Sequence, residues 1–293
     1  MPAPRVSVVV PHYNDPAGLA LCLASLTAQT LPRDQFEIVV ADNDSPIGAE
    51  AVERAIAGRA RMTVVTEKGA GPARNGGVAM ATGEILAFID SDCVAEPEWL
   101  VEGLRALADH DFVGGRVKVS AADPARPTPS EAFEAVFAFN FQDYIERKGF
   151  TGSGNMFVPR RIFDAVGGFR KGVSEDIEWS HRARGMGYRL GYASAAVISH
   201  PGRRTWRELV AKNRRINQEM FLLARERRGG RLRYLARTWA LPPSAILHTP
   251  RVITSAALPD WGARRRALVT LYRLRLWRFA DGNMLALRSL WKA

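Results

Sequence analysis

The sequence has little cysteine and no long apolar run. Its 293 residues include two cysteines, Cys22 and Cys93, too few for a disulfide framework, so we expect a reducing compartment. No stretch of about 18 apolar residues is present, and this predicts that no helix spans a membrane. The first residues lead into an apolar segment at Val6 without a secretory signal pattern. A cytoplasmic location is therefore expected.

Acidic residues are scarce in the last third of the chain. Residues 201–293 carry 21 Lys and Arg but 5 Asp and Glu, whereas residues 1–200 carry 20 and 25. The overall net charge of +11 thus comes from a basic tail behind a mildly acidic front part. Such a tail indicates an anionic partner, which can be a membrane surface, a nucleic acid or a phosphorylated substrate, or it is a solvated face that aids solubility.

The first 110 or so residues alternate between short apolar runs and helical patterns. The alternation is typical of βαβ units and predicts an α/β, Rossmann-like, mostly parallel sheet flanked by helices. Asp15 and Pro16 predict the start of the first helix, because Asp caps helices and Pro suits their first turn. The predicted strands are 6–10, 36–41, 62–65 and 84–89, and the predicted helices are 19–26, 49–56, 73–81 and 96–107.

Polar residues follow each of these four strands, which places them at one edge of the sheet, where open α/β sheets bind ligands. Asp90 and Asp92 follow the strand 84–89 and form a D-x-D pattern that can hold a divalent cation, Mn²⁺ or Mg²⁺. A lone D-x-D is more often a solvated turn, but four polar clusters at successive strand ends indicate a site. The clusters are 12–15, 42–44, 67–68 and 90–92.

Beyond residue 110 the alternation is less regular. Strands are expected at 112–119 and 195–199, and helices at 177–186 and 206–228. Aromatic residues at helical spacing predict one helix over 131–147, with the aromatic stripe in the core. The tail predicts a basic helix over 264–279 with imperfect amphipathicity, since Arg275 interrupts its apolar arc.

Seven short motifs in order from about residue 6 to 218 give the chain a resemblance to the inverting glycosyltransferases of family 2, of the non-processive bacterial type, which have a GT-A fold. One such motif is weak, and seven in order are strong. They are Val6–Asn14, Asp42–Ser45, Ala73–Gly77, Phe88–Asp92, Gly154–Met156, Val166–Phe169 and Glu175–Asp176.

The resemblance implies a nucleotide-sugar donor, with UDP-sugar expected because Asp42 matches a carboxylate that accepts from uracil N3–H. Arg74 is expected at the start of a helix, facing the diphosphate. The expected donor-binding residues are Pro11, Tyr13, Asp42, Arg74, Asp90 and Ser91.

The resemblance also implies a metal site and a general base. Asp92 is the expected principal metal ligand, with Asp90 and His200 as further ligands, although a lone His is as often structural. Asp176 is expected to deprotonate the acceptor hydroxyl, with a helix N-terminus as the structural alternative for the Glu175–Asp176 pair. Gly154, Asn155 and Glu175 are expected on the acceptor side.

These expectations divide the chain into a glycosyltransferase domain, 1–228, and a basic helical extension, 229–293. The domain has a nucleotide-binding half, 1–110, and an acceptor half, 111–228. Processive synthases carry a Q-x-x-R-W segment. Gln218 of this chain is not followed by the Arg and Trp that complete it. We therefore expect transfer of a single sugar to a hydroxyl of a glycan or lipid-linked acceptor, as in polysaccharide biosynthesis.

For the tail we expect peripheral contact with anionic lipid on the cytoplasmic face of the inner membrane, while packing on the chain itself or in a homodimer stays open. Two other functions would each explain part of the sequence. A sugar nucleotidyltransferase would share the sheet but needs a basic, glycine-rich loop after the first strand, where this chain has Pro11–Asp15. A nucleic-acid-binding protein would explain the basic tail but not the carboxylates, so nucleic acid is not expected as a partner.

Overall fold

The computed structural model describes residues 5–226 and 228–290, and the chain divides into two compact units. Unit 1 comprises residues 1–118, 139–171 and 175–200, and unit 2 comprises residues 119–138, 172–174 and 201–293. The elements in chain order are β1 (Val6–His12), α1 (Pro16–Thr27), η1 (Arg33–Gln35), β2 (Phe36–Asp42), α2 (Ala49–Ile56), β3 (Arg61–Val64), α3 (Ala70–Met80), β4 (Ile85–Ile89), β5 (Val94–Ala95), α4 (Trp99–Ala106), β6 (Phe112–Ser120), α5 (Pro129–Phe137), α6 (Phe141–Asp143), η2 (Tyr144–Lys148), β7 (Asn155–Pro159), α7 (Arg160–Val166), α8 (Glu175–Gly185), β8 (Leu190–Pro201), α9 (Trp206–Arg225), α10 (Gly230–Trp239), α11 (Leu241–Ile253) and α12 (Trp261–Leu290).

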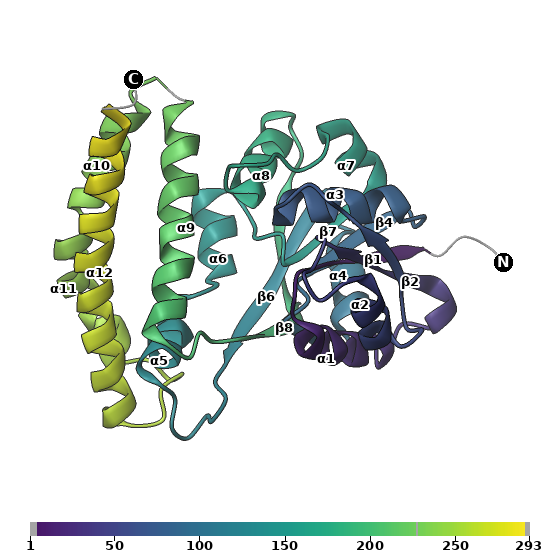
Figure 1. Cartoon of the computed structure of the whole chain (residues 1–293), viewed down its shortest axis with the longest axis horizontal. Coiled ribbons are helices and arrows are strands. Elements are labelled where there is room, and N and C mark those ends of the chain that lie inside the picture. The colour runs from purple at the N-terminus through teal and green to yellow at the C-terminus, as the bar shows by residue number, and fades with distance from the viewer. Residues whose placement is uncertain (1–4, 227, 291–293) are drawn as a thin grey trace. The chain divides into compact units, whose positions relative to one another are not determined.

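Unit 1 is a sheet covered by helices on both faces (Figure 1). The strand order is β3-β2-β1-β4-β7-β6-β8-β5. Pairing is parallel from β3 through β4, and it is antiparallel between β4 and β7, β6 and β7, and β5 and β8. The expected α/β fold with its parallel half is confirmed.

The strands of the parallel half are apolar on both faces because each face is covered. Val8 and Val10 of β1 point into the core with α1, α2 and α4, whereas Val9 points into the core with α3, α7 and α8. At the first turn of α1, Asp15 accepts a hydrogen bond from the Gly18 amide and Pro16 occupies the first turn. The helix start predicted from these two residues is confirmed.

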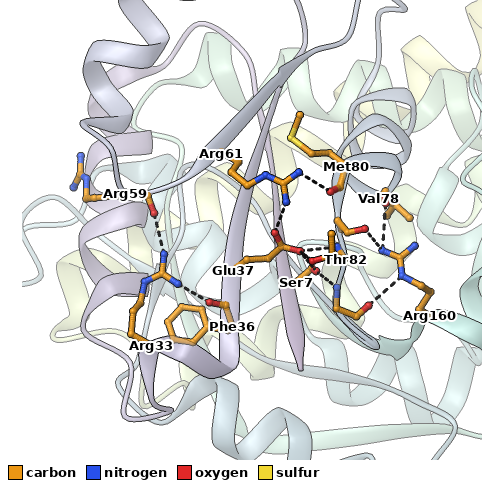
Figure 2. Close-up of polar contacts among 12 residues, drawn as sticks. Ser7, Arg33, Phe36, Glu37, Arg59, Arg61, Val78, Met80, Thr82 and Arg160 are labelled. Carbon is orange, nitrogen blue, oxygen red and sulfur yellow. Dashed lines mark hydrogen bonds and ion pairs between the residues drawn. The ribbon is translucent and has the colours of Figure 1, made fainter. Parts of the chain in front are cut away.

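A polar network closes the amino-terminal edge of the parallel half (Figure 2). The Glu37 carboxylate, at the start of β2, accepts hydrogen bonds from the Ser7 hydroxyl and from the amide and hydroxyl of Thr82, and it pairs with Arg61. Arg160 donates to three carbonyl oxygens along the last turn of α3 and the turn that follows. This network ties three strands and α3 together at the edge opposite the polar strand ends described below.

Unit 2 is built on helices. Its core is formed by α5, α9, α11 and α12, with Ala263 and Ala267 of α12 fully buried. Small residues four positions apart on one helix face allow neighbouring helices to approach closely. In the described part of the chain, no helix is long and apolar enough to cross a membrane.

The single helix predicted over 131–147 is wrong. Helix α5 ends at Phe137, because Ala138 is extended and Phe139 has φ of +53°, in the left-handed region. The chain resumes as α6 and the π-helical turn η2. Aromatic spacing continues across this break, which is why the sequence pattern did not reveal it. The basic helix predicted over 264–279 is longer, extending over Trp261–Leu290.

Candidate active site

The carboxyl ends of β3, β2, β1 and β4 lie side by side, since these strands are neighbours and parallel. His12 at the end of β1 pairs in register with Asp42 at the end of β2, and Pro11 with Ala41. The predicted gathering of four polar clusters at one edge is therefore confirmed. The chain reverses its strand order between β1 and β4, and such a point forms the ligand crevice of open α/β sheets.

The Asp42 carboxylate is buried and bonded within the protein. It accepts hydrogen bonds from the Ser45 hydroxyl and amide and from His12 Nδ1 at 2.8 Å. Because the Asp15 amide donates to His12 Nε2, the ring proton lies on Nδ1. Burial raises the pKa of Asp42, but the hydrogen bonds from Ser45 and His12 outweigh burial and hold it below its usual value. Asp42, the carboxylate expected to contact the uracil base, is thus hydrogen-bonded within the protein and holds the ends of β1 and β2 together.

Beside Asp42, an exposed aromatic ring lies next to a lysine. Tyr13 is 54% exposed, and Lys68 Nζ lies 5.4 Å from its ring centroid. Lys68 also donates to the backbone carbonyls of Asn43 and Asp44. The Asn43 side chain in turn accepts from the Gly69 amide at 2.8 Å, fixing the loop that leads into α3. A rigid, exposed ring flanked by a cation suits stacking of a planar base.

Arg74 is buried and bridges two carboxylates. Its guanidinium donates to Asp90 Oδ1 at 2.5 Å and to Glu175 Oε1 at 2.9 Å. Burial lowers the pKa of Arg74, but Asp90 and Glu175 outweigh burial and raise it above its usual value. The expectation that Arg74 starts its helix is wrong, because α3 begins at Ala70. The structure shows Arg74 fixing Asp90 and Glu175.

Gly154 and Asn155 have structural reasons for their identity. A Cβ at Gly154 would overlap the Asp90 carboxylate, so glycine lets Asp90 lie against this turn. The Asn155 amide is fully buried, donates to the carbonyls of Arg116 and Ala196, and accepts from Trp99 Nε1. The structure assigns Asn155 to joining strands inside unit 1 and not to the expected contact with an acceptor.

Three potential metal-ligating groups meet where β4 ends. Asp92 Oδ2 and His200 Nε2 are 3.4 Å apart, and one ligand atom each from Asp92, Cys93 and His200 lies within 4.8 Å of the others. The His200 ring packs on Phe139 with 4.5 Å between centroids, which orients the imidazole. The sequence expectation that Asp92 and His200 come together is met by this geometry, and a carboxylate with an imidazole fits a divalent transition ion.

Cys93 is the group that the sequence reasoning did not connect with the site. Its thiol lies 3.7 Å from Asp92 Oδ1. Burial, followed by the charges of Asp90 and Asp92, raises the pKa of the Cys93 thiol well above its usual value. A bound cation would itself favour the thiolate, so Cys93 stands beside Asp92 and His200 as a third candidate ligand.

Asp176 follows Glu175 in the first turn of α8 and is partly exposed. Its Oδ1 accepts from the Ile177 amide at 2.8 Å, which is typical of an acid at a helix start. The negative charge of Asp176 contributes to the raised pKa of Arg74, so the carboxylate lies within electrostatic range of the Asp90–Arg74–Glu175 bridge. Ser91, also partly exposed, lies in the turn between Asp90 and Asp92.

The structure adds residues that the sequence alone did not single out as site residues: His12, Ser45, Lys68 and Cys93. Each stands in or beside one of the strand-end clusters, so position could have drawn attention to them. Their partners lie 30 or more residues away in two cases, and spacing along the chain does not indicate such pairs.

Comparison with known proteins places this site in a family. The sequence model described as glycosyl transferase family 2 matches residues 7–171, more than half of the chain. The glycosyltransferase AglE of Haloferax volcanii is 30% identical over 223 residues, covering 73% of this chain and 72% of that protein. A validoxylamine A glucosyltransferase of Streptomyces hygroscopicus is 33% identical over 153 residues, but those residues are 36% of its length and 50% of this chain.

Two solved structures are similar in fold. The mannosyltransferase PcManGT of Pyrobaculum calidifontis, in complex with GDP-Man and Mn²⁺, has a TM-score of 0.62 and 25% identity, covering 99% of this chain and 88% of that one. TarS residues 1–349 of S. aureus, with UDP-GlcNAc, has a TM-score of 0.52 and 18% identity, covering 96% and 89%. Sequence, site geometry and fold agree: the chain belongs to glycosyl transferase family 2 and is a glycosyltransferase with the GT-A fold.

Proposed function

We propose that this protein transfers a single sugar from a nucleotide-sugar donor to a hydroxyl of a glycan or lipid-linked acceptor, with inversion at the sugar and with a divalent cation. The observation that carries the proposal is the cluster at the end of β4, where Asp92 and His200 meet beside the Asp90–Arg74–Glu175 bridge. Absence of the Q-x-x-R-W segment after Gln218 supports single transfer over chain extension.

On the donor side, Tyr13 provides the stacking ring, and Pro11 and the buried His12–Asp42 pair fix the backbone from which it projects. UDP is the first donor to test, because Asp42 matches the family's uracil contact. Since the Asp42 carboxylate is already bonded to His12 and Ser45, the test includes other nucleotides. Mannosyltransferase PcManGT is similar to this chain and was solved with GDP-Man, which makes GDP the main alternative.

Asp92 and His200 would hold the cation, and Asp90 would face its bound waters or the donor ribose. A bound cation neutralises the charge that develops on the leaving diphosphate. A mixed oxygen and nitrogen donor set suits Mn²⁺ better than Mg²⁺ or Ca²⁺, which prefer oxygen ligands alone. We therefore propose Mn²⁺ as the preferred ion.

Asp176 is the proposed general base. Inversion requires a carboxylate that takes the proton of the acceptor hydroxyl as its oxygen attacks the sugar carbon and the nucleoside diphosphate leaves. Glu175 is tied to Arg74 by an ion pair of 2.9 Å, so its carboxylate is already engaged within the protein.

A thermal-shift panel tests the donor and metal parts together. The chain is heated with UDP, GDP, CDP or ADP, each with Mn²⁺, with Mg²⁺ or with a chelator, since a ligand that binds the folded state raises the melting temperature. We expect a rise that requires Mn²⁺ in the wild type and disappears in Asp92→Ala. A metal-independent rise, or an unchanged rise in Asp92→Ala, would remove Asp92 from the metal site. Proton NMR of the product's anomeric coupling then shows inversion or retention.

A further inference from the structure

Helices α11 and α12 of unit 2 carry large apolar side chains on the side that faces solvent. Six of them are each more than half exposed, and we call these six the outer face: Ile246 and Leu247 of α11 and Trp261, Val269, Leu276 and Leu287 of α12. Single exposed apolar residues are ordinary, but a row of them on adjoining helices marks an interaction surface.

The outer face of α12 lies opposite its buried face. At 3.6 residues per turn, Trp261, Val269, Leu276 and Leu287 fall within an arc of about 80°. Four buried residues of α12 in the core of unit 2 lie roughly on the opposite side of the helix: Ala263, Ala267, Leu271 and Leu274. A surface helix that packs on one side only is polar on the other. Helix α12 carries apolar residues on both sides. The single apolar arc that the sequence suggested is therefore divided between the two sides: Leu271 is buried, whereas Leu276 is 58% exposed.

The outer residues of the two helices adjoin. Tyr272, which lies within the exposed arc of α12, shares a hydrogen bond of 3.0 Å with the hydroxyl of Thr249 on α11. Ile246 lies three residues before Thr249 and therefore on the same side of α11, and Ala245 and Val252 of α11 pack in the same core as the inner face of α12. Figure 1 shows α11 and α12 running alongside one another. The outer face is therefore one surface shared by two helices.

The charges around this surface are nearly all positive. Residues 241–290 contain eight arginines, no lysine and two acidic residues, Asp260 and Asp281. Arg251 of α11 and Arg265 and Arg273 of α12 are exposed, and Arg265 lies within the same arc as the outer face. Apolar residues with arginine between and beside them are typical of helices that lie in a membrane interface.

We propose that the outer face binds the surface of an anionic lipid bilayer, with α11 and α12 lying along it. Positive charge suits the anionic headgroups and the apolar side chains suit the headgroup–acyl boundary. A second copy of the chain is a poorer occupant, because two such surfaces would bring their arginines together. Duplex nucleic acid would satisfy the charge but would leave the six apolar side chains without apolar partners. The proposal uses no residue of the candidate active site, so it and the proposed function stand or fall separately.

Vesicle co-sedimentation of the whole chain tests the proposal. The vesicles contain either equal parts of phosphatidylglycerol and phosphatidylcholine or phosphatidylcholine alone. We expect the wild type to sediment with the anionic vesicles and the double variant Ile246→Glu/Leu276→Glu to lose roughly tenfold or more in affinity. The matched control is Leu21→Glu/Met186→Glu, which makes the same charge change at two residues of unit 1 that are also more than half exposed. It should bind as the wild type does.

Several results would overturn the proposal. The first is wild-type protein that stays in the supernatant with anionic vesicles. The second is an outer-face variant that binds as tightly as the control, while both variants retain the wild-type circular dichroism spectrum and melting temperature. Sedimentation velocity adds a third. A wild-type dimer that the outer-face variant abolishes, with no vesicle binding, would assign the surface to a homodimer instead. Arg251→Gln/Arg265→Gln should weaken vesicle binding mainly at low salt, and binding that is indifferent to both salt and this variant would contradict the electrostatic part.

Discussion

Replacing Arg74 by methionine should destabilise unit 1 and show how much the buried bridge contributes. The guanidinium is 5% exposed and holds Asp90 at 2.5 Å and Glu175 at 2.9 Å. Methionine has a similar length and no charge, so it leaves both carboxylates without their cation. The cost therefore comes from two uncompensated negative charges and only in small part from lost packing.

The magnitude follows from the burial of the three groups. Removing one partner of a fully buried ion pair costs about 3–5 kcal/mol. The side chains of Asp90 and Glu175 are 34% and 19% exposed, so water partly solvates the charges left behind, and we expect a loss of about 2–4 kcal/mol. For a domain of this size the loss corresponds to a fall in melting temperature of roughly 5–15 °C. Adding Glu175→Gln to Arg74→Met should recover part of it, since one unpaired charge is then removed.

Urea denaturation followed by circular dichroism measures these changes. The matched control is Arg105→Met, which removes an ion pair to Glu102 whose arginine is 70% exposed and should cost less than about 0.5 kcal/mol. An Arg74→Met variant no less stable than the Arg105→Met control would refute the reasoning, because the bridge would then contribute nothing beyond an exposed pair. Failure of Glu175→Gln to recover stability would show that packing, and not charge, is what Arg74 supplies.

Three further predictions concern catalysis, acid stability and the metal site. Asp176→Asn should lower kcat at least about 100-fold with little change in donor affinity, and a variant of near wild-type kcat would place the base elsewhere. Hydrogen bonds from Ser7 and Thr82 and the pairing with Arg61 outweigh the effect of burial and hold the pKa of Glu37 below its ordinary value of 4.5. Its contribution to stability is thus present above that value and lost as pH falls through the folded-state pKa, so Glu37→Gln should cost about 1–2 kcal/mol at neutral pH and less at pH 3. An equal cost at both pH values in denaturant titrations would contradict this assignment. His200→Ala should weaken Mn²⁺ binding more than Mg²⁺ binding in isothermal titration, and equal effects on the two ions would argue against an imidazole ligand.

Much of unit 1 could be predicted from local sequence patterns. The strands of the parallel half are continuous apolar runs, and this pattern arises because both faces of the sheet are covered. Asp15 and Pro16 determine the start of α1 through a cap and a preset φ, both of which act within one turn. The helix predicted over 131–147 fails for the converse reason. Its end at Phe137 depends on the left-handed conformation of Phe139, for which no glycine or proline in the sequence gives a signal.

The candidate site was likewise predictable in part from the sequence and in part only from the structure. The sequence placed Asp90 and Asp92 at the end of one strand and Asp42 at the end of another strand, on the same edge of the sheet. It could not show that Asp42 is bonded to His12, or that Arg74 lies between Asp90 and Glu175. Asp42 and Arg74 were expected to face the donor because they are charged residue types. Both are buried instead, since burial of a charged group depends on partners that folding brings from far along the chain.

By itself the sequence determined the family, the parallel half of the sheet and the edge at which polar residues gather, because the alternation of apolar runs and the order of the motifs are local properties of the chain. Tertiary structure decided which carboxylates stay accessible and which are tied to buried partners, since Glu175 is 101 residues from Arg74 along the chain. It also decided the two faces of α12. An apolar arc in a sequence does not state which of its residues will be covered, and the answer depends on which helices pack against it.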